Sequence, residues 1–291
     1  MMDISQLKTL IALVDTGSIT GAARILNRVP SAITIRLQQL EENLDTPLFL
    51  REKKSLIATP KALLLYQYAQ QIVALAQEAE HQIKSDQPCG PFRVGALESM
   101  AAARLPLPLA QLYATYPAIE LELVTGIRDT LYQSLIDGAL DVILIGDAPQ
   151  NPLLNRTLIL DEELVIIAAK AHPEILTPSD TENATILVFK EGCSYRDRLL
   201  SWYQSFNRTP KRIAEVTSYH AILGGVAAGM GIAIIPKSML EIFPNTDLLS
   251  IHPLNSALGR IQIELIWRKN LASANIQALE KCLKSTVTAV Q

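Results

Sequence analysis

The first 59 residues alternate between short stretches of helical hydrophobic spacing and tight turns. In the first stretch the apolar residues stand three or four positions apart, and Gly17 then stops the helix. These residues are Leu7, Leu10, Ile11 and Val14. Ser18 can cap a second helix from about Ile19 to Leu26, which carries the small Ala22 and Ala23. Only three residues separate it from Pro30, which suits the first turn of a third helix, so the spacing predicts a helix-turn-helix.

The third helix, from Pro30 to about Asn43, has an apolar side and an unusual opposite side. At about 100° per residue, Leu37, Leu40 and Leu44 fall on the side of Ile33. The opposite face or its flank carries Ser31, Thr34, Ile35, Gln38 and Glu42. Hydroxyls and amides can hydrogen-bond base edges, and isoleucine can contact a thymine methyl, so this face fits a major groove. The alternative is a solvated helix with one exposed isoleucine.

Neighbouring basic residues add candidate contacts to DNA. Arg28 and Pro30 stand at the start of the third helix, and Arg36, on its flank, could reach a phosphate or a guanine. A short basic hairpin with Arg51 follows. Lys53 and Lys54 at its tip would bind the phosphate backbone whatever its sequence, although two lysines on a turn are usually only solvated.

A heptad pattern predicts one long helix from Pro60 to about Gln87. Its seam contains Ala62, Leu65, Ala69, Ile72, Ala76, Ala79 and Ile83. Three heptads without glycine or proline favour pairing with an identical helix, so we predict dimerisation through this seam from Leu65 to Ile83. Because aliphatic residues also lie off the seam, a core helix of one domain is the alternative. Two prolines and a glycine between Pro88 and Pro91 then mark the clearest domain boundary.

After Pro91, strand-like and helical stretches alternate, and this order predicts parallel sheets. The expected strands lie at 92–96, 119–124, 141–145, 164–169, 186–189, 213–216 and 232–235. The expected helices lie at 100–115, 128–138, 195–206 and 219–229. A break near 161–164 suggests two lobes. A strand from Ile261 to Trp267 and a last helix from about Ser273 to Val290 would return to the first lobe.

Composition changes this picture only locally. A chain of 291 residues with 49% hydrophobic content can bury ample core, and its length favours two domains. The net charge of −3 gives no hint of a nucleic-acid partner. From Arg24 to Lys61, however, seven basic residues stand against four acidic ones, so this segment carries +3 and the rest −6. A nucleic-acid footprint can be local in this way.

Other classes of protein find little support. The N-terminus shows no secretory signal, and the longest weakly polar run, 221–236, is too short and too rich in glycine to span a membrane, so a cytoplasmic protein is expected. Three distant cysteines fit reduced thiols, and the four histidines show no ligand spacing. We therefore expect no metal and no cofactor. A catalytic pair at Tyr219 and His220 lacks any partner that spacing can supply.

The stretch "GSITGAARILNRVPSAITIRLQQLEENLDTPLFLR" resembles the LysR-type transcriptional regulators. Weaker similarity continues through "RVGALES", "YPAIELELVTG", "GALDVILI" and "GVAAGMGIAIIP". The resemblance implies a winged helix-turn-helix, a dimerising linker helix and a two-lobed effector domain similar to periplasmic solute-binding proteins. Asp45 departs from the usual helix-ending glycine, but Asp tolerates the left-handed conformation. Ile35 stands where the family often has arginine or another polar residue, which affects the operator that is read.

The predicted fold class is therefore α/β with an N-terminal all-α winged helix-turn-helix. We assign residues 1–59 to the DNA-binding domain, 60–88 to the dimerising linker helix and 91–291 to the effector-binding domain. Lobe one covers about 91–162 and 268–291, and lobe two about 163–267.

Effector-contacting residues are expected in loops beyond the carboxyl ends of parallel strands. The predicted set is Glu98, Ser99, Met100, Thr125, Gly126, Asp147, Cys193, Ser194, Tyr195, Ser218 and Tyr219. The four hydroxyls of Ser99, Thr125, Ser194 and Ser218 could bind a carboxylate with backbone amides, and Glu98 or Asp147 could hold an amine. For each hydroxyl, helix capping is the alternative. Cys193 has no second cysteine near in sequence and reads as a small loop residue rather than a redox switch.

The sequence thus predicts a DNA-binding transcriptional regulator, not an enzyme, that is controlled by a small carboxylate or amino-acid-like effector. Its expected partners are double-stranded DNA, the effector, further copies of itself as a dimer or tetramer, and RNA polymerase; no membrane partner is expected. The alternative is an α/β solute binder or enzyme whose N-terminal helices serve association only. The face at Ser31, Thr34, Ile35 and Gln38 distinguishes the two.

Overall fold

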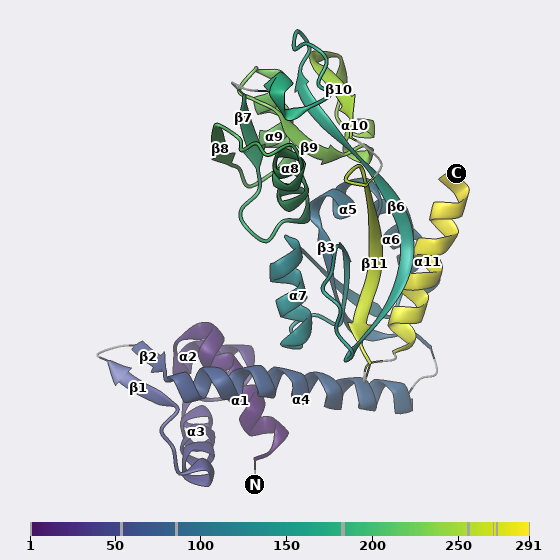
Figure 1. Cartoon of the computed structure of the whole chain (residues 1–291). Coiled ribbons are helices and arrows are strands. Elements are labelled where there is room, and N and C mark those ends of the chain that lie inside the picture. Colours follow the sequence, from purple (N-terminus) through teal and green to yellow (C-terminus); the bar gives the residue numbers. More distant parts are fainter. Residues whose placement is uncertain are drawn as a thin grey trace. The chain divides into compact units, whose positions relative to one another are not determined.

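The chain folds into two compact units, and each is described by itself (Figure 1). The computed structural model describes residues 2–52, 55–84, 87–181, 184–254, 257–269, 271 and 273–290. Unit 1 comprises Met1–Asp86 and Ile136–Ala139, and unit 2 comprises Gln87–Leu135 and Leu140–Gln291.

Unit 1 contains three short helices, a two-stranded hairpin and one long helix. They are α1 (Ile4–Thr16), α2 (Ile19–Ile25), α3 (Pro30–Leu44), β1 (Phe49–Glu52), β2 (Ser55–Ala58) and α4 (Pro60–Lys84). Gly17 ends α1 in the left-handed conformation at φ 60°, and the Ser18 hydroxyl accepts from the Gly21 amide to cap α2. Asn27 also takes a positive φ of 51°, which turns the chain from α2 into α3. The predicted helix-turn-helix is therefore present.

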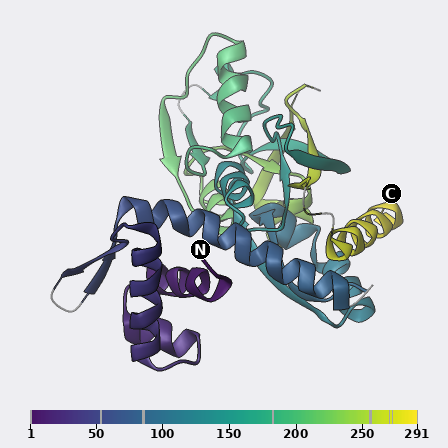
Figure 2. The ribbon, with the colours of Figure 1, turned by 90° about the horizontal axis from the view of Figure 1, so that it is seen from below.

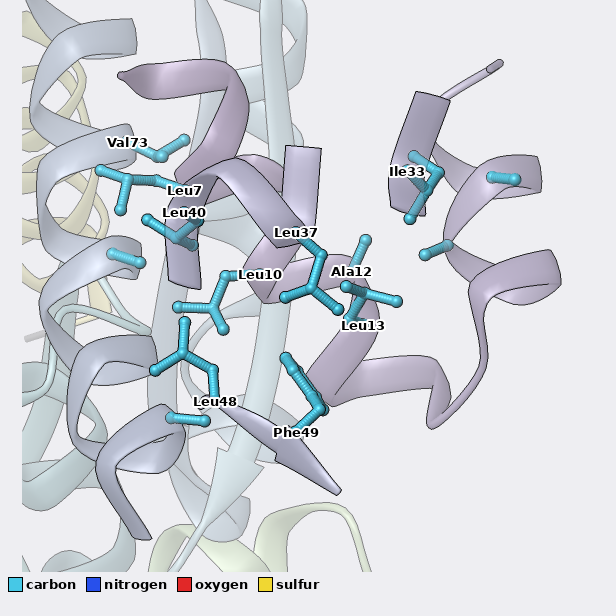
Figure 3. Packing of buried hydrophobic residues seen from close by; sticks show 14 residues of the cluster. Leu7, Leu10, Ala12, Leu13, Ile33, Leu37, Leu40, Leu48, Phe49 and Val73 are labelled. Carbon is cyan, nitrogen blue, oxygen red and sulfur yellow. The ribbon is translucent and has the colours of Figure 1, made fainter. Parts of the chain in front are cut away.

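One hydrophobic core holds these helices together (Figure 3). Leu10 and Leu13 of α1 lie against Leu37 and Leu40 of α3, and all four are buried. The small Ala22 and Ala23 of α2 are also buried, which allows the close helix packing that their size predicts. In Figure 2 the three short helices gather along one part of α4, whose buried residues Ala62, Ala69 and Val73 belong to the same core.

The end of α3 shows how the helix can stop at Asp45, where a glycine is usual. This residue caps the helix with φ 45° and ψ 44°, so it takes the left-handed conformation in which glycine is usual. The Glu41 side chain then accepts from the backbone amides of Leu48 and Phe49 at 2.6 and 3.1 Å. The expected turn is confirmed, and Glu41 fixes the chain as it enters the hairpin.

Unit 2 contains a large mixed sheet, a small parallel sheet and surrounding helices. Its strands are β3 (Gly90–Leu97), β4 (Ile119–Gly126), β5 (Val142–Gly146), β6 (Leu154–Ala169), β7 (Thr185–Val188), β8 (Arg212–Glu215), β9 (Ala233–Pro236), β10 (Leu249–Pro253) and β11 (Arg260–Arg268). Its helices are α5 (Glu98–Ala103), α6 (Pro106–Thr115), α7 (Arg128–Ile136), α8 (Ser194–Ser205), α9 (Tyr219–Ala227), α10 (Ser238–Glu241) and α11 (Ala274–Val290). Two 3₁₀ turns lie at Pro178–Thr181 and Thr246–Leu248.

Among the described residues, seven strands form the large sheet in the order β10-β6-β11-β5-β3-β4, with β9 also paired to β6. Lobe one is built on β3, β4, β5, β11 and the first part of β6. Lobe two is built on the rest of β6 with β7, β8, β9 and β10. The predicted parallel pairing holds for β3 with β4 and β5 and for β7 with β8. It is wrong for the partners of β6 and for β11 with β5, which are antiparallel.

The predicted break near 161–164 is also wrong, because β6 continues through it. Leu154–Glu163 pairs with β11, and Leu164–Ala169 pairs with β9 and β10, so one strand passes from lobe to lobe. Its central acids resemble a loop in sequence but have partners in the fold. Glu162 binds Arg104 at 3.3 Å, and Glu163 binds Lys237 at 2.9 Å. The α/β class is confirmed, but the lobes share a strand.

The single helix expected from 100 to 115 is two helices. α5 ends at Ala103 and α6 begins at Pro106. Proline has no amide hydrogen to donate inside a helix, whereas it suits the first turn. Pro106 therefore starts a new helix.

Candidate functional site

The outward face of α3 lies opposite its buried side. Ser31, Ile35 and Gln38 are exposed, and the Ile35 side chain keeps 53% of its surface. Ile33 and Leu37, from the same helix, are buried in the unit 1 core. The face is therefore not covered by other described parts of unit 1.

Thr34 lies at the edge of this face and is partly buried. Its hydroxyl donates to the Pro30 carbonyl at 3.1 Å. That hydrogen bond leaves its lone pairs and its methyl group for other contacts.

The start of α3 adds an exposed residue that sequence reasoning missed. Val29 precedes Pro30 in extended conformation and keeps 62% of its surface. Arg28 and Pro30 are exposed beside it, and Arg36 is half-buried on the flank. The available signal was its position directly before Pro30, at the start of the proposed reading helix.

The hairpin is formed by β1 and β2, whose register runs from Phe49 opposite Ala58 to Glu52 opposite Ser55. The backbone of Arg51 lies in β1, and its side chain is outside the description. Lys53 and Lys54 lie outside the described residues.

The seam predicted along α4 needs correction. Ala69 is completely buried in the unit 1 core, and Leu65 packs partly against that core. Neither is free to form a continuous seam with another chain, because α1 already covers this side of the helix. Ile72 and Ala79 are exposed, Ala76 is half-buried, and the side chain of Ile83 is outside the description.

An exposed apolar stripe on α4 shares Ile72 and Ala79 with the predicted seam but otherwise consists of other residues. It contains Leu64, Tyr68, Ile72 and Leu75, with exposed fractions of 41–56%, and Ala79 continues it. These residues stand three or four positions apart, so they share one side of the helix. Both stripes have helical spacing, and only the packing of α1 distinguishes them.

In unit 2, a cavity of about 410 Å³ lies where four strands end. Lobe one contributes residues at and directly after the ends of β3 and β4, and lobe two contributes residues at and after the ends of β7 and β8. Its lining comprises Leu97, Glu98, Thr125, Gly126, Ile127, Thr130, Phe189, Lys190, Cys193, Tyr195, Glu215, Val216, Thr217 and Tyr219. Predicted residues among them are Glu98, Thr125, Gly126, Cys193, Tyr195 and Tyr219.

The predicted hydroxyls other than Thr125 have structural partners instead. The buried Ser194 hydroxyl donates to the Gly146 carbonyl at 3.1 Å. Ser99 shares a buried hydrogen bond of 3.2 Å with the Tyr195 hydroxyl. Ser218 caps α9 by accepting from the Ala221 amide at 3.2 Å. The capping or packing alternative therefore holds for these three serines, and they do not line the pocket.

Asp147 and Met100 also do not line the pocket. Asp147 forms a two-pronged ion pair with Arg198, both contacts being 2.7 Å. Met100 is buried in the core. Both were predicted because they follow strands closely, but one completes an ion pair and the other fills space.

Three charged side chains line the pocket. Glu98 accepts from the Tyr219 amide at the start of α9 at 3.3 Å. Glu215 is paired with Arg196 at 2.5 Å, so its charge is neutralised locally. Lys190 is exposed.

Burial sets the protonation state of three further lining groups. It raises the pKa of the Tyr195 and Tyr219 hydroxyls, so both stay neutral over the physiological range. Burial likewise raises the pKa of the Cys193 thiol, which keeps it from the thiolate form that reacts with oxidants. The structure supports a space-filling role for Cys193.

Sequence reasoning missed much of the lining. Phe189 and Lys190 directly follow β7, and Val216 and Thr217 directly follow β8. The same strand-end rule that selected Thr125 applies to them. The predicted strands ran one residue too far, so they included Phe189 and Val216 themselves.

Two other features, a metal site and a membrane-spanning helix, are not supported by the described part of the chain. There, no group of three His, Cys, Asp or Glu side chains could hold a metal ion. Within the same residues, no helix is both long enough and apolar enough to cross a membrane.

Comparisons with known proteins agree with both units. Residues 4–63 match the family model for the bacterial regulatory helix-turn-helix protein of the lysR family, and residues 85–288 match the LysR substrate binding domain. The chain is 33% identical over 270 residues to the HTH-type transcriptional regulator GltR of Bacillus subtilis (strain 168), covering 92% of this chain and 91% of that protein. It is 31% identical over 285 residues to the HTH-type transcriptional regulator SoxR of Arthrobacter sp. (strain TE1826), covering 98% and 96%.

Solved structures share the fold at lower identity. A full-length OxyR variant from Pseudomonas aeruginosa aligns with a TM-score of 0.75 at 20% identity, covering 98% of each chain. Full-length CbnR in complex with its target DNA aligns with a TM-score of 0.70 at 21% identity, covering 98% of this chain and 100% of that one.

Proposed function

Because the chain belongs to the LysR family of transcriptional regulators, we propose that it reads its operator with the outward face of α3 and senses a small molecule in the pocket of unit 2. The family makes it a DNA-binding transcriptional regulator with an effector-binding domain, not an enzyme. Its partners are double-stranded DNA, an effector and further copies of itself. Because DNA is its target, we place its action in the cytoplasm.

The observation that carries the DNA proposal is the exposure of Ser31, Ile35 and Gln38 opposite buried leucines. The Ile35 side chain contributes little to the core of its own domain, because more than half of its surface is exposed. Hydroxyl, amide and methyl groups match what base edges offer in the major groove. In this proposal Ser31, Thr34, Ile35 and Gln38 read bases, and Val29 adds an apolar contact at the helix start.

Contacts to phosphate supply affinity without sequence choice. We assign them to Arg28, Arg36 and Arg51 and to the hairpin lysines Lys53 and Lys54, with Pro30 setting the start of the helix. Cations release condensed counterions from DNA, so their contribution weakens with salt. The division of roles predicts different salt behaviour for the two sets of residues.

For self-association we propose the exposed stripe of α4, formed by Leu64, Tyr68, Ile72, Leu75 and Ala79. Exposed aliphatic residues at helical spacing favour burial against a partner helix. Residues 1–59, 60–88 and 91–291 remain the proposed DNA-binding, linker and effector-binding domains.

For the effector we propose a small amino-acid-like molecule bound between the two lobes. The cavity of about 410 Å³ has the size of such a ligand's site. Its lining is largely apolar, with a few polar groups from both lobes. Thr125 and Lys190 are the groups suited to a carboxylate, because one offers a hydroxyl and the other a positive charge.

The test of the DNA proposal is a gel shift on promoter fragments at two salt concentrations. We expect specific retention that weakens with salt. Ile35→Ala or Gln38→Ala should lower specific affinity about 10-fold and leave affinity for unrelated DNA unchanged. Asn43→Ala, at the far end of the same helix and also exposed, is the matched control. An equal loss for specific and unrelated DNA would contradict base reading by this face.

A further inference from the structure

We propose that the effector carries a positively charged amine, and that Glu98 binds it inside the pocket. This inference rests on the proposed effector function of the pocket and assigns its recognition chemistry. It concerns the orientation of the ligand, that is, which lining residues bind its ammonium group and which bind its anionic group. The hydrogen bonds that the lining residues already make determine this orientation.

The first step is the state of the α9 N-terminus. The start of a helix offers free amides that commonly bind a ligand's anion. Here the Tyr219 amide already donates to Glu98 Oε1 at 3.3 Å, and the Ala221 amide already donates to the Ser218 hydroxyl. The protein's own carboxylate thus takes the place that a ligand carboxylate would need. A ligand anion there would have to displace Glu98 and would meet its negative charge.

The second step is the charge balance of the lining. The carboxylates that line the pocket are Glu98 and Glu215. Arg196 lies 2.5 Å from Glu215 and also donates to the Phe189 carbonyl, so it is committed to the lobe two wall. Glu98 contacts a neutral amide instead of a cation. Its charge is therefore the one available for a ligand cation.

The third step is the aromatic wall. Phe189, Tyr195 and Tyr219 line the same pocket as Glu98. The rings of Phe189 and Tyr219 meet edge to face, with centroids 5.0 Å apart. Aromatic faces attract ammonium groups, and cages of aromatic rings bind quaternary ammonium ligands. Both tyrosines are neutral, so they add no anion of their own.

Lys190 completes the assignment. It is exposed, while Glu98 is partly buried. An amine that reaches Glu98 leaves the other end of the ligand for Lys190 and the Thr125 hydroxyl. The pocket therefore orients an amino-acid-like effector with its ammonium on Glu98 and its anionic group on Lys190.

The test pairs each amine with an amine-free molecule of the same shape. The probes are glycine betaine with tert-butylacetate, leucine with isocaproate, and butylamine with butanol, measured by calorimetry on the full chain and on Glu98→Gln. Glutamine keeps an oxygen for the Tyr219 amide and removes only the charge. At least one amine should bind the natural protein, its partner should not, and Glu98→Gln should weaken the amine about 10- to 100-fold.

Glu122→Gln is the matched control, because Glu122 is exposed on β4 and lies outside the pocket. It should bind the amine like the natural protein. The inference is overturned if no amine of the panel binds, if an amine and its partner bind equally, or if Glu98→Gln binds the amine unchanged.

A pocket-filling variant separates this inference from the proposed function. Thr130 is exposed on α7 and lines the pocket, so Thr130→Trp should block the cavity without disturbing the core. If an amine-free probe bound the natural protein as well as its amine did, and Thr130→Trp blocked that binding, the proposed effector pocket would stand. Only the assignment of an amine to the effector would be overturned. If Thr130→Trp left the binding of every probe unchanged, the proposed effector pocket would be overturned as well.

Discussion

The outward face of α3 and the strand ends of unit 2 both contain hydroxyl residues that the sequence assigned to a partner, but the structure places them differently. On α3, Ser31 is exposed, and no described part of unit 1 covers it. In unit 2, Ser99 and Ser194 are buried and hydrogen-bonded to their own chain. Polar residues on one helix stay on the side that the apolar stripe leaves free. Polar residues at strand ends meet whatever segments the fold brings there.

The comparison teaches where a hydroxyl can be assigned from sequence. A buried hydroxyl must find a partner, and inside a protein the nearest carbonyl or phenol usually supplies it. Only hydroxyls that the fold leaves at a surface or in a cavity, such as Thr125, remain available to a ligand.

The largest effect should separate the two sides of α3. Ile33→Ala removes a buried side chain and should lower the free energy of unfolding of unit 1 by about 2–5 kcal/mol. Ile35→Ala, two residues away, should change it by less than about 0.5 kcal/mol. Denaturant unfolding of both variants measures the difference. A comparable loss for Ile35→Ala would mean that its face is packed after all, and the comparison would fail.

The next effect concerns the exposed stripe of α4. Leu64→Asp combined with Ile72→Asp should raise the dimer dissociation constant about 100-fold or more, because two charges would enter an apolar contact. Analytical sedimentation at several protein concentrations measures the dimer dissociation constant. Gln77→Asp, exposed on another side of the helix, should leave assembly unchanged. If the double variant sediments like the natural protein, this stripe is not the interface.

The smallest effect separates a buried hydroxyl from a pocket hydroxyl within unit 2. Ser194→Ala leaves the Gly146 carbonyl without its partner and should cost about 1–3 kcal/mol of unfolding free energy. Thr125→Ala, at an exposed pocket position, should cost less than about 0.5 kcal/mol. Thermal or denaturant unfolding compares them. Equal costs would show that the pocket hydroxyl is structural too.

The elements of unit 1 were predictable because each depends on a local pattern. Gly17, Ser18 and Pro30 act on the backbone next to them, and one apolar stripe per helix suffices to orient Ile33 inward and Ile35 outward. The αL turn at Asp45 followed from the residue's own conformational range. Even so, the predicted seam on α4 included Ala69, which is buried, and left out Leu64, which is exposed, because both are apolar and only contact with α1 distinguishes them.

Unit 2 was less predictable because the pairing of its strands depends on residues that are distant in the sequence. The acidic residues Glu162 and Glu163 of β6 resemble a loop in the sequence. In the fold they pair with Arg104 and Lys237. The antiparallel return of β11 between β5 and β6 leaves no local mark in the chain. Most strands were predicted, but β10 and the first part of β6 were not, and parallel pairing held only for β3 with β4 and β5 and for β7 with β8.

The amino-acid sequence alone determined the helix-turn-helix, the two faces of α3, the α/β class and the family, since these depend on periodicity, capping residues and short motifs that act over a few positions. The tertiary structure decided which side of α4 stays exposed, which hydroxyls are consumed by internal hydrogen bonds, and that Glu98 occupies the start of α9. Those outcomes depend on groups far apart in the chain, and their pairing free energies exist only once the fold has brought them together.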